Sequence, residues 1–116
     1  MREPLRDKGR LLHILEAINA IFEYTDGVSY EQLRDNKMLF SAVVYNTVII
    51  GEASHMLTQD FKDTHPDTNW RVIKSMRNHL VHGYYQVDLD DVWHVIQHDL
   101  TPLKEQIEEY LSELDA

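Results

Sequence analysis

Apolar residues recur every three or four positions along most of the chain, which is the spacing of one buried face of an α-helix. The first such stripe lies in residues 5–24, at Leu11, Ile14, Leu15, Ile18, Ile21 and Phe22. Asp26 and Gly27 follow it, and glycine readily adopts the left-handed conformation that ends helices. Ser29 and Gln32 have the spacing of a capping box, which predicts a short helix up to about Arg34.

A second long stripe predicts a helix over residues 37–61, with its face formed by Leu39, Val43, Asn46, Ile50, Ala53 and Leu57. Residues 62–69 contain Pro66 and predict a loop, followed by a helix over residues 70–82 that ends at Gly83. Asp67, Thr68 or Asn69 could cap that helix. Four tyrosines are typical of the edge of a helical bundle: Tyr24, Tyr30, Tyr45 and Tyr110.

The last helix is predicted to begin at Asp88 or Asp90, and Pro102 falls inside its apolar stripe. Proline removes one backbone hydrogen bond and crowds the preceding turn, so we expect a kink or break near residues 99–101. A fresh helix start, with Thr101 as the cap and Pro102 at the first helical position, is equally plausible.

These elements predict an all-α fold: an antiparallel up-and-down bundle of four long helices plus one short helix, with the last helix kinked or broken near Pro102. At 116 residues the chain is expected to form a single domain over residues 1–116. No apolar run is long enough for a membrane span, no apolar leader precedes the first helix, and cysteine is absent. We therefore expect a cytoplasmic protein.

Charge is unevenly distributed along a chain whose formal net charge is −9. So acidic a chain is a poor non-specific binder of nucleic acid. Acidic residues dominate residues 86–116, whereas basic residues outnumber acidic ones in residues 1–10 and 67–85. An anionic ligand is therefore expected at one of these two basic segments.

The second basic segment also contains the densest group of reactive side chains. Arg77 offers a fixed fork of donors suited to a phosphate, and His82 can exchange a proton near neutral pH. Tyr84 adds a phenol, and Lys74 widens the positive charge. Helical spacing allows these groups to converge at one helix end, but a basic helix C-terminus complementing the helix dipole would have the same composition.

Arg77-x4-His82-x-Tyr84, with Asn78 after the arginine and Gly83 before the tyrosine, resembles the Arg-x4-6-His-x-Tyr motif of HEPN-domain ribonuclease toxins, most closely the HepT branch. Further segments match that family upstream and downstream of the motif: Gly51-Glu52-Ala53, Pro66…Trp70, residues 10–16 and Asp91-Val92-Trp93. The resemblance therefore covers nearly the whole chain, about residues 6–111.

The resemblance implies a helical bundle that forms a homodimer, with two motifs facing each other across a cleft. It implies an endoribonuclease that needs no metal or other cofactor, in which the 2′-hydroxyl of RNA is the nucleophile. It also implies a type VII toxin–antitoxin module. A minimal nucleotidyltransferase antitoxin (MntA-like) would neutralise the toxin by AMPylation of the motif tyrosine, here Tyr84.

On this interpretation His82 transfers protons and Arg77 stabilises the negative charge on the phosphate. Lys74 and Asn78 are supporting residues of the site. Glu52 is either a carboxylate on the helix surface or a group that holds Arg77 in place. The alternative function is a non-catalytic helical subunit that binds a nucleotide or substrate beside a nucleotidyltransferase.

Two metal sites compete weakly with this interpretation. Glu52 and His55 have the spacing of a di-iron ligand pair, but Asp91 with His94 is only a loose second copy. His94 and His98 could share a zinc ion if a third ligand were supplied. A solvated helix face explains both patterns more simply, as it does the acidic residues around Glu105 and Glu109, which could also meet a basic antitoxin surface.

Overall fold

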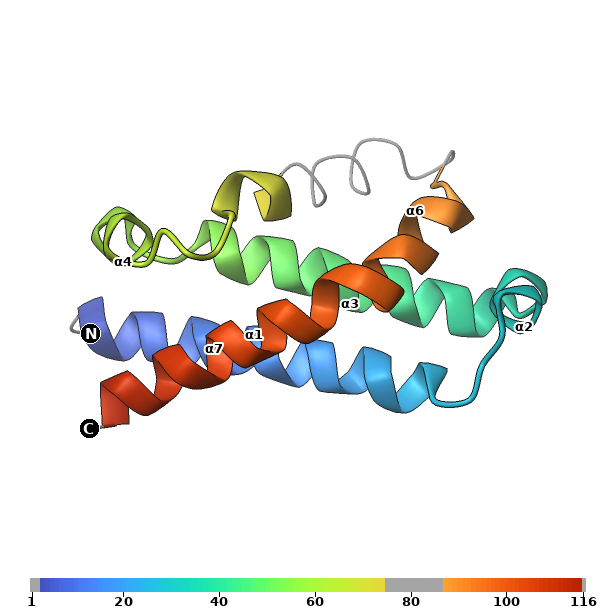
Figure 1. The fold of residues 1–116 in the computed structure, drawn as a ribbon, viewed down its shortest axis with the longest axis horizontal. Helices are drawn as coiled ribbons and strands as arrows, with labels where there is room; N and C mark the ends of the chain where they lie inside the picture. Colours follow the sequence, from blue (N-terminus) through green and yellow to red (C-terminus); the bar gives the residue numbers. More distant parts are fainter. Residues whose placement is uncertain (1–2, 75–86, 116) are drawn as a thin grey trace.

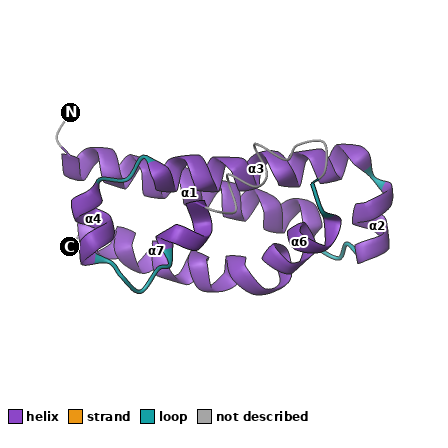
Figure 2. Cartoon of the chain, turned by 90° about the horizontal axis from the view of Figure 1, so that it is seen from above, coloured by secondary structure: helices purple, strands orange, loops and turns teal. Residues whose placement is uncertain are grey.

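The computed structural model describes residues 3–74 and 87–115, and the regular structure in these ranges is helical, without a strand (Figure 2). The elements are α1 (Glu3–Thr25), α2 (Tyr30–Asp35), α3 (Lys37–His55), α4 (Gln59–Thr64), α6 (Leu89–His94), the π-helix η2 (Val95–Asp99) and α7 (Leu100–Asp115). A further helix begins at Trp70 and is described as far as Lys74; we call it the motif helix. The predicted all-α class is confirmed, whereas most of the third long helix lies outside the described residues.

The long helices α3 and α7 both run opposite to α1, so the two ends of the chain lie at the same end of the bundle (Figure 1). Both of them pack against α1. The predicted stripe of α1 is its core face: Leu11, Ile14, Ile18 and Ile21 are fully buried. They join one hydrophobic cluster with Val43 and Ile50 of α3 and with Leu100 and Ile107 of α7.

The N-terminal connections follow the predicted local chemistry. Gly27 has a φ of +71°, in the left-handed region that favours glycine, directly after α1 ends. Ser29 accepts a hydrogen bond from the Gln32 N–H (3.1 Å), and the Gln32 side chain accepts one from the Ser29 N–H (2.8 Å). The predicted capping box is therefore formed at the start of α2.

The predicted helix over residues 37–61 is wrong at its C-terminal end, because α3 stops at His55 and a separate short helix, α4, follows. Thr58 has an extended backbone and its side chain accepts a hydrogen bond from the Phe61 N–H (3.2 Å), so it caps α4. The apolar stripe continued through Leu57 and Phe61, which are both buried, and hid this cap. The predicted loop over residues 62–69 is accordingly shorter, because α4 extends to Thr64.

The core face of α3 is also rotated from the predicted one. Thr47 and Ser54 are buried, whereas Asn46 is only half-buried. The two buried hydroxyls donate to carbonyls four residues earlier, Thr47 to Val43 (2.9 Å) and Ser54 to Ile50 (2.7 Å). Since each polar group is satisfied within its own helix, these residues can pack inside the bundle.

The expected irregularity near Pro102 lies one turn earlier. Asp88 caps α6 as predicted, and the helix then widens into the π-helical turn η2, where the Leu100 N–H bonds to the Val95 carbonyl. Leu100 keeps helical angles (φ −73°, ψ −37°), so the chain does not restart at Thr101. A π turn accommodates the hydrogen bond that proline cannot donate while Ile96, Leu100 and Leu103 stay in the core.

No helix within residues 3–74 and 87–115 combines the length and the apolar character required to cross a membrane.

Candidate functional site

The four central residues of the predicted site, Arg77, Asn78, His82 and Tyr84, lie outside the described residues. Two supporting residues are described. Lys74 is exposed on the motif helix, and Glu52 is half-buried near the end of α3. Whether Glu52 holds Arg77 therefore stays a prediction. What the structure shows is how the helix that begins at Trp70 starts and what surrounds its first turn.

The motif helix begins at Trp70, as predicted. Of the three candidate caps, Asn69 is the one that acts, because its side-chain oxygen accepts a hydrogen bond from the Val72 N–H (3.2 Å). Ile73 on the same turn is buried against the core, whereas Arg71, Val72 and Lys74 are exposed. The first turn thus has one face packed inward and its basic residues facing solvent.

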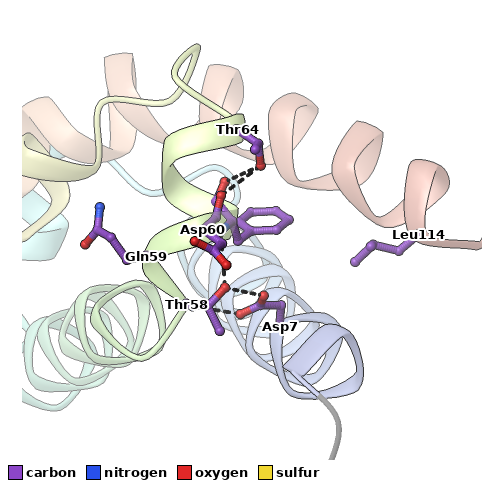
Figure 3. Close-up of a pocket in the computed structure, with 7 residues that line it drawn as sticks. Asp7, Thr58, Gln59, Asp60, Thr64 and Leu114 are labelled. Carbon is purple, nitrogen blue, oxygen red and sulfur yellow. Dashed lines mark hydrogen bonds between the residues drawn. The ribbon is translucent and has the colours of Figure 1, made fainter.

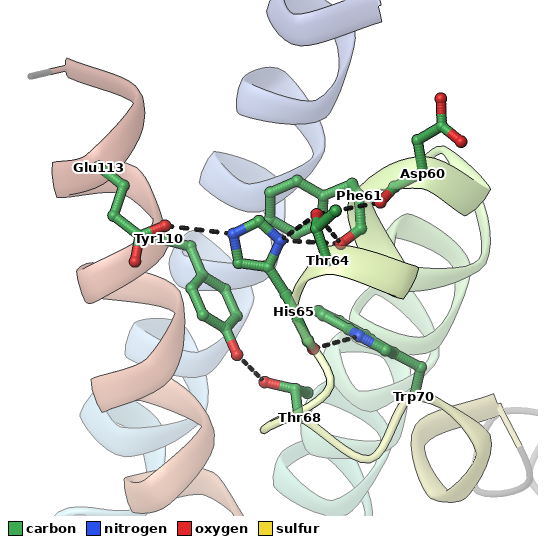
Figure 4. Close-up of polar contacts among 8 residues, drawn as sticks. All are labelled: Asp60, Phe61, Thr64, His65, Thr68, Trp70, Tyr110 and Glu113. Atoms are coloured by element: carbon green, nitrogen blue, oxygen red, sulfur yellow. Dashed lines mark hydrogen bonds and ion pairs between the residues drawn. The ribbon is translucent and has the colours of Figure 1, made fainter.

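The loop before the motif helix is tied to α7 by a chain of hydrogen bonds that starts at Thr68. The Thr68 hydroxyl donates to the Gln106 side-chain oxygen (2.7 Å), and the Gln106 amide donates to the Asp67 carbonyl (3.0 Å). Since the threonine proton is used there, the Tyr110 hydroxyl donates to Thr68 (2.7 Å; Figure 4). Polar groups in such a chain polarise one another and fix the loop in one position.

An aromatic cluster also fixes this loop (Figure 4). The His65 ring stacks on Phe61, with centroids 3.9 Å apart, and its Nδ1 lies 2.8 Å from the Phe61 carbonyl. Its Nε2 lies 3.2 Å from a carboxylate oxygen of Glu113 on α7. Each ring nitrogen thus has an oxygen atom within hydrogen-bond distance, and these contacts hold the ring between α4 and α7. The Trp70 indole then donates to the His65 carbonyl (3.0 Å), which joins the loop to the motif helix.

Tyr110 stands at the centre of this region, and its placement at the bundle edge is wrong: it is only 4% exposed. Burial raises the pKa of its phenol above the ordinary value. Tyr110 therefore stays protonated at neutral pH and can donate to Thr68. Sequence reasoning missed this role, as it did those of His65, Thr68 and Gln106, because contacts between residues some forty positions apart have no local pattern.

Two hollows flank α4, and their charges differ. The first lies between α4 and the ends of α1 and α7. The described residues that line it include the carboxylates Asp7 and Asp60 but no basic residue (Figure 3). Asp7 is buried and its carboxylate accepts from both the Thr58 N–H (2.8 Å) and the Thr58 hydroxyl (2.7 Å). Its role is thus to hold the cap of α4 against α1. A phosphate would be repelled here.

The second hollow, which we call the basic hollow, has a volume of about 400 Å³ and lies on the other side of α4. Its lining comes from three elements: the end of α3, α4 and the first turn of the motif helix. The residues are Ser54, His55, Gln59, Lys62, Asp63, Trp70, Arg71 and Lys74. Among the described residues, it therefore gathers three basic side chains around one carboxylate, beside the first turn of the motif helix.

The metal alternatives gain no further ligand from the structure. The rings of His94 and His98 lie side by side, with centroids 4.6 Å apart. Over residues 3–74 and 87–115, no set of three or more histidine, aspartate or glutamate side chains is grouped so that it could hold a metal ion.

Comparison with known proteins places these features in a family. The family model described as Ribonuclease HepT-like matches residues 14–110. "Probable ribonuclease HepT" of Thermococcus cleftensis is 38% identical over 101 residues, covering 87% of this chain and 92% of that protein. "Putative RNase MJ1380" of Methanocaldococcus jannaschii is 34% identical over 101 residues, covering 87% and 93%. "Putative RNase TTE0752" of Caldanaerobacter subterraneus is 33% identical over 101 residues, covering 87% and 90%. No solved structure matches the chain.

Proposed function

Because the chain belongs to the HepT-like family of ribonucleases, we propose that it is the toxin of a type VII toxin–antitoxin module, and that it cuts RNA without a metal ion. The observation that carries this proposal is the family match, which spans the residues Arg77 to Tyr84 of the motif. The anchored start of the motif helix supports it, since a catalytic group requires a rigid base.

In the proposed reaction the 2′-hydroxyl of the RNA attacks the adjacent phosphorus. The new bond joins O2′ to phosphorus, and the bond from phosphorus to the 5′-oxygen of the next nucleotide breaks. One base takes the proton of the 2′-hydroxyl and one acid delivers a proton to the leaving oxygen. His82 performs the proton transfers, and Arg77 stabilises the charge that develops on the phosphate oxygens. Asn78 and Lys74 assist in orienting the phosphate.

A homodimer would complete this chemistry, because two copies of His82 would provide one base and one acid. It would also bring two copies of Arg77 and two basic segments to one groove, which offsets the acidic net charge of each chain. The partners we propose are therefore a second copy of the chain and an RNA, in the cytoplasm.

Neutralisation by a minimal nucleotidyltransferase antitoxin (MntA-like) follows the same charge logic. Attachment of AMP to Tyr84 would add a negatively charged phosphate two residues from His82, where it can pair with Arg77. The adduct would also occupy the space that the RNA backbone needs. Mass spectrometry of the toxin after co-expression with the antitoxin should show AMP on Tyr84, and a Tyr84→Phe toxin should escape modification.

The decisive experiment compares His82→Ala with His13→Ala, a matched change at an exposed histidine on α1. Cleavage of RNA in the presence of EDTA should persist in the wild type and in His13→Ala. In His82→Ala it should fall by about 10²–10⁴-fold, the usual contribution of a general acid or base. When each protein is expressed without the antitoxin, the wild type and His13→Ala should inhibit growth, and His82→Ala should inhibit it much less.

Two results would contradict the proposal. Toxicity that survives His82→Ala would point to the non-catalytic subunit that binds a nucleotide or substrate beside a nucleotidyltransferase. Loss of wild-type cleavage on addition of EDTA, restored by a divalent metal, would replace the metal-independent mechanism.

A further inference from the structure

We propose that the basic hollow is a second phosphate-binding subsite, which holds the RNA backbone a few nucleotides away from the bond that is cut. This inference rests on the proposed function, because it assigns the path of the RNA substrate toward the motif. The residues that carry it are Lys62 of α4 and Arg71 of the motif helix. Lys74, which we assign to the phosphate that is cut, also lines the hollow and lies between Arg71 and Arg77 in the sequence.

The first argument is that these three cations are not used in the fold. Lys8 lies 2.6 Å from Asp115 and Arg34 lies 2.8 Å from Asp35, so other basic residues do form ion pairs. Lys62, Arg71 and Lys74 form none with any carboxylate in residues 3–74 and 87–115. In a chain with net charge −9, three unpaired cations around one hollow are free to bind an anion.

The second argument is that Asp63, the one carboxylate among the described residues that line the hollow, already accepts a hydrogen bond. Asp63 accepts a hydrogen bond from the Gln59 side-chain amide (2.9 Å), one turn away on α4. Among the described residues, the lining is thus three cations against one carboxylate. The hollow on the other side of α4, with Asp7 and Asp60, has the opposite character. Charge therefore selects one side of α4 for a phosphate.

The third argument is the distance to the motif. Lys74 precedes Arg77 by three residues, and three residues of chain span at most about 11 Å even when fully extended. An RNA backbone that reaches Arg77 therefore passes close to Lys74 and to the basic hollow that Lys74 lines. Arg71 lies three residues before Lys74, on the same side of a helix.

The fourth argument is the rigidity of the wall. Trp70 lines the hollow, and its indole is held by the His65 carbonyl (3.0 Å) and packed near Phe61, with ring centroids 6.2 Å apart. A partly exposed aromatic side chain beside basic groups is the composition with which single-stranded RNA is bound, by stacking and charge together. An RNA strand thus fits the hollow better than a free small anion, which would use the charges alone.

The test pairs Lys62→Gln with Arg71→Gln in one variant and leaves Lys74 intact. The matched control carries Lys37→Gln and Lys104→Gln, which remove the same charge from other parts of the bundle. Binding is measured by fluorescence anisotropy with a labelled 2′-O-methyl RNA of about twelve nucleotides, within the usual range of single-strand sites. This RNA cannot be cleaved because its 2′-oxygens carry no proton, so binding is observed without catalysis.

Each backbone phosphate contact contributes about 0.7 to the slope of log affinity against log salt for a single strand. Loss of two contacts should therefore lower the slope by about 1.4, so that the affinity ratio between about 50 and about 200 mM salt shrinks about sevenfold. The control pair should change the slope much less. With a cleavable RNA of the same length, KM should rise in the test pair while kcat is retained, and a dinucleotide should be cut equally by all three proteins.

An unchanged slope in the test pair, or an equal change in both pairs, would overturn the proposed subsite. The first result would leave the hollow to an acidic protein partner, and the second would indicate an effect of overall charge. Failure of the proposed function is recognised separately: the wild type would not cut RNA, yet the slope of the test pair would still report on the hollow.

Discussion

Replacement of Thr68 by valine isolates the hydrogen-bond chain that positions the motif helix. Thr68 is 4% exposed and its hydroxyl has two partners at 2.7 Å, the Tyr110 hydroxyl and the Gln106 side-chain oxygen. Valine has nearly the same shape, so no cavity is created and the change removes only the hydroxyl. The buried Tyr110 hydroxyl is left without its acceptor, whereas half-buried Gln106 can turn toward water.

The expected loss follows from these two partners. A stranded buried polar group costs about 1–3 kcal/mol, and the weaker loss at Gln106 adds about 0.5–1 kcal/mol. We therefore expect the free energy of unfolding to fall by about 1.5–4 kcal/mol. For a domain of this size each kcal/mol lowers Tm by roughly 4 °C, so Tm should drop by roughly 6–16 °C.

The assay is chemical denaturation followed by circular dichroism, with Thr64→Val as the matched control. Thr64 is exposed. Its hydroxyl donates to carbonyls of its own helix, those of Asp60 (3.0 Å) and Phe61 (3.1 Å), and it also lies 3.0 Å from Nδ1 of the adjacent His65. Water can replace that donor, so the control should lose less than about 0.5 kcal/mol. Thr68→Ser keeps the hydroxyl and should retain much of the stability. If Thr68→Val were as stable as Thr64→Val, the hydrogen-bond chain would not hold the loop as described.

Two further predictions concern the core and its pH dependence. Ile107→Ala removes a fully buried side chain of α7, and it should lower the free energy of unfolding by about 2–5 kcal/mol in urea denaturation; a loss below about 1 kcal/mol would show that this core is loosely packed. Tyr110→Phe tests the raised pKa of the Tyr110 phenol. Because this pKa is higher in the folded state than in the unfolded state, the protonated phenol stabilises the fold below about pH 10, and this stabilisation is lost as the pH rises further. The wild type should therefore lose more stability than Tyr110→Phe between neutral pH and about pH 11, and parallel losses in thermal denaturation would refute a burial effect at this residue.

Local patterns were sufficient for much of the fold. The stripe of α1, the glycine after it and the capping box at Ser29 each depend on residues within a few positions of one another, and all three are confirmed. The long apolar stripe over residues 37–61 misled because burial and helix continuity are separate properties. Leu57 remains buried although the chain leaves the helix after His55.

In the candidate site, too, the sequence identified some residues and not others. The motif residues Arg77, His82 and Tyr84 are recognisable from their spacing, and the family match over residues 14–110 includes them. The groups that fix the start of the motif helix were not recognisable. Thr68 meets Tyr110, and His65 meets Glu113, across more than forty residues of sequence. Glu52 could be named from the sequence, but its role depends on which way the helix faces.

Helical periodicity, caps and the reactive motif were thus determined by the sequence itself, because each is a short-range property of the backbone and its side chains. Only the tertiary structure decided which polar residues are buried, since that depends on how helices distant in the sequence pack together. It placed Tyr110 inside the bundle and Asp7 against the cap of α4. It also brought Lys62 and Arg71 to one hollow, because α4, the first turn of the motif helix and the end of α3 all border it.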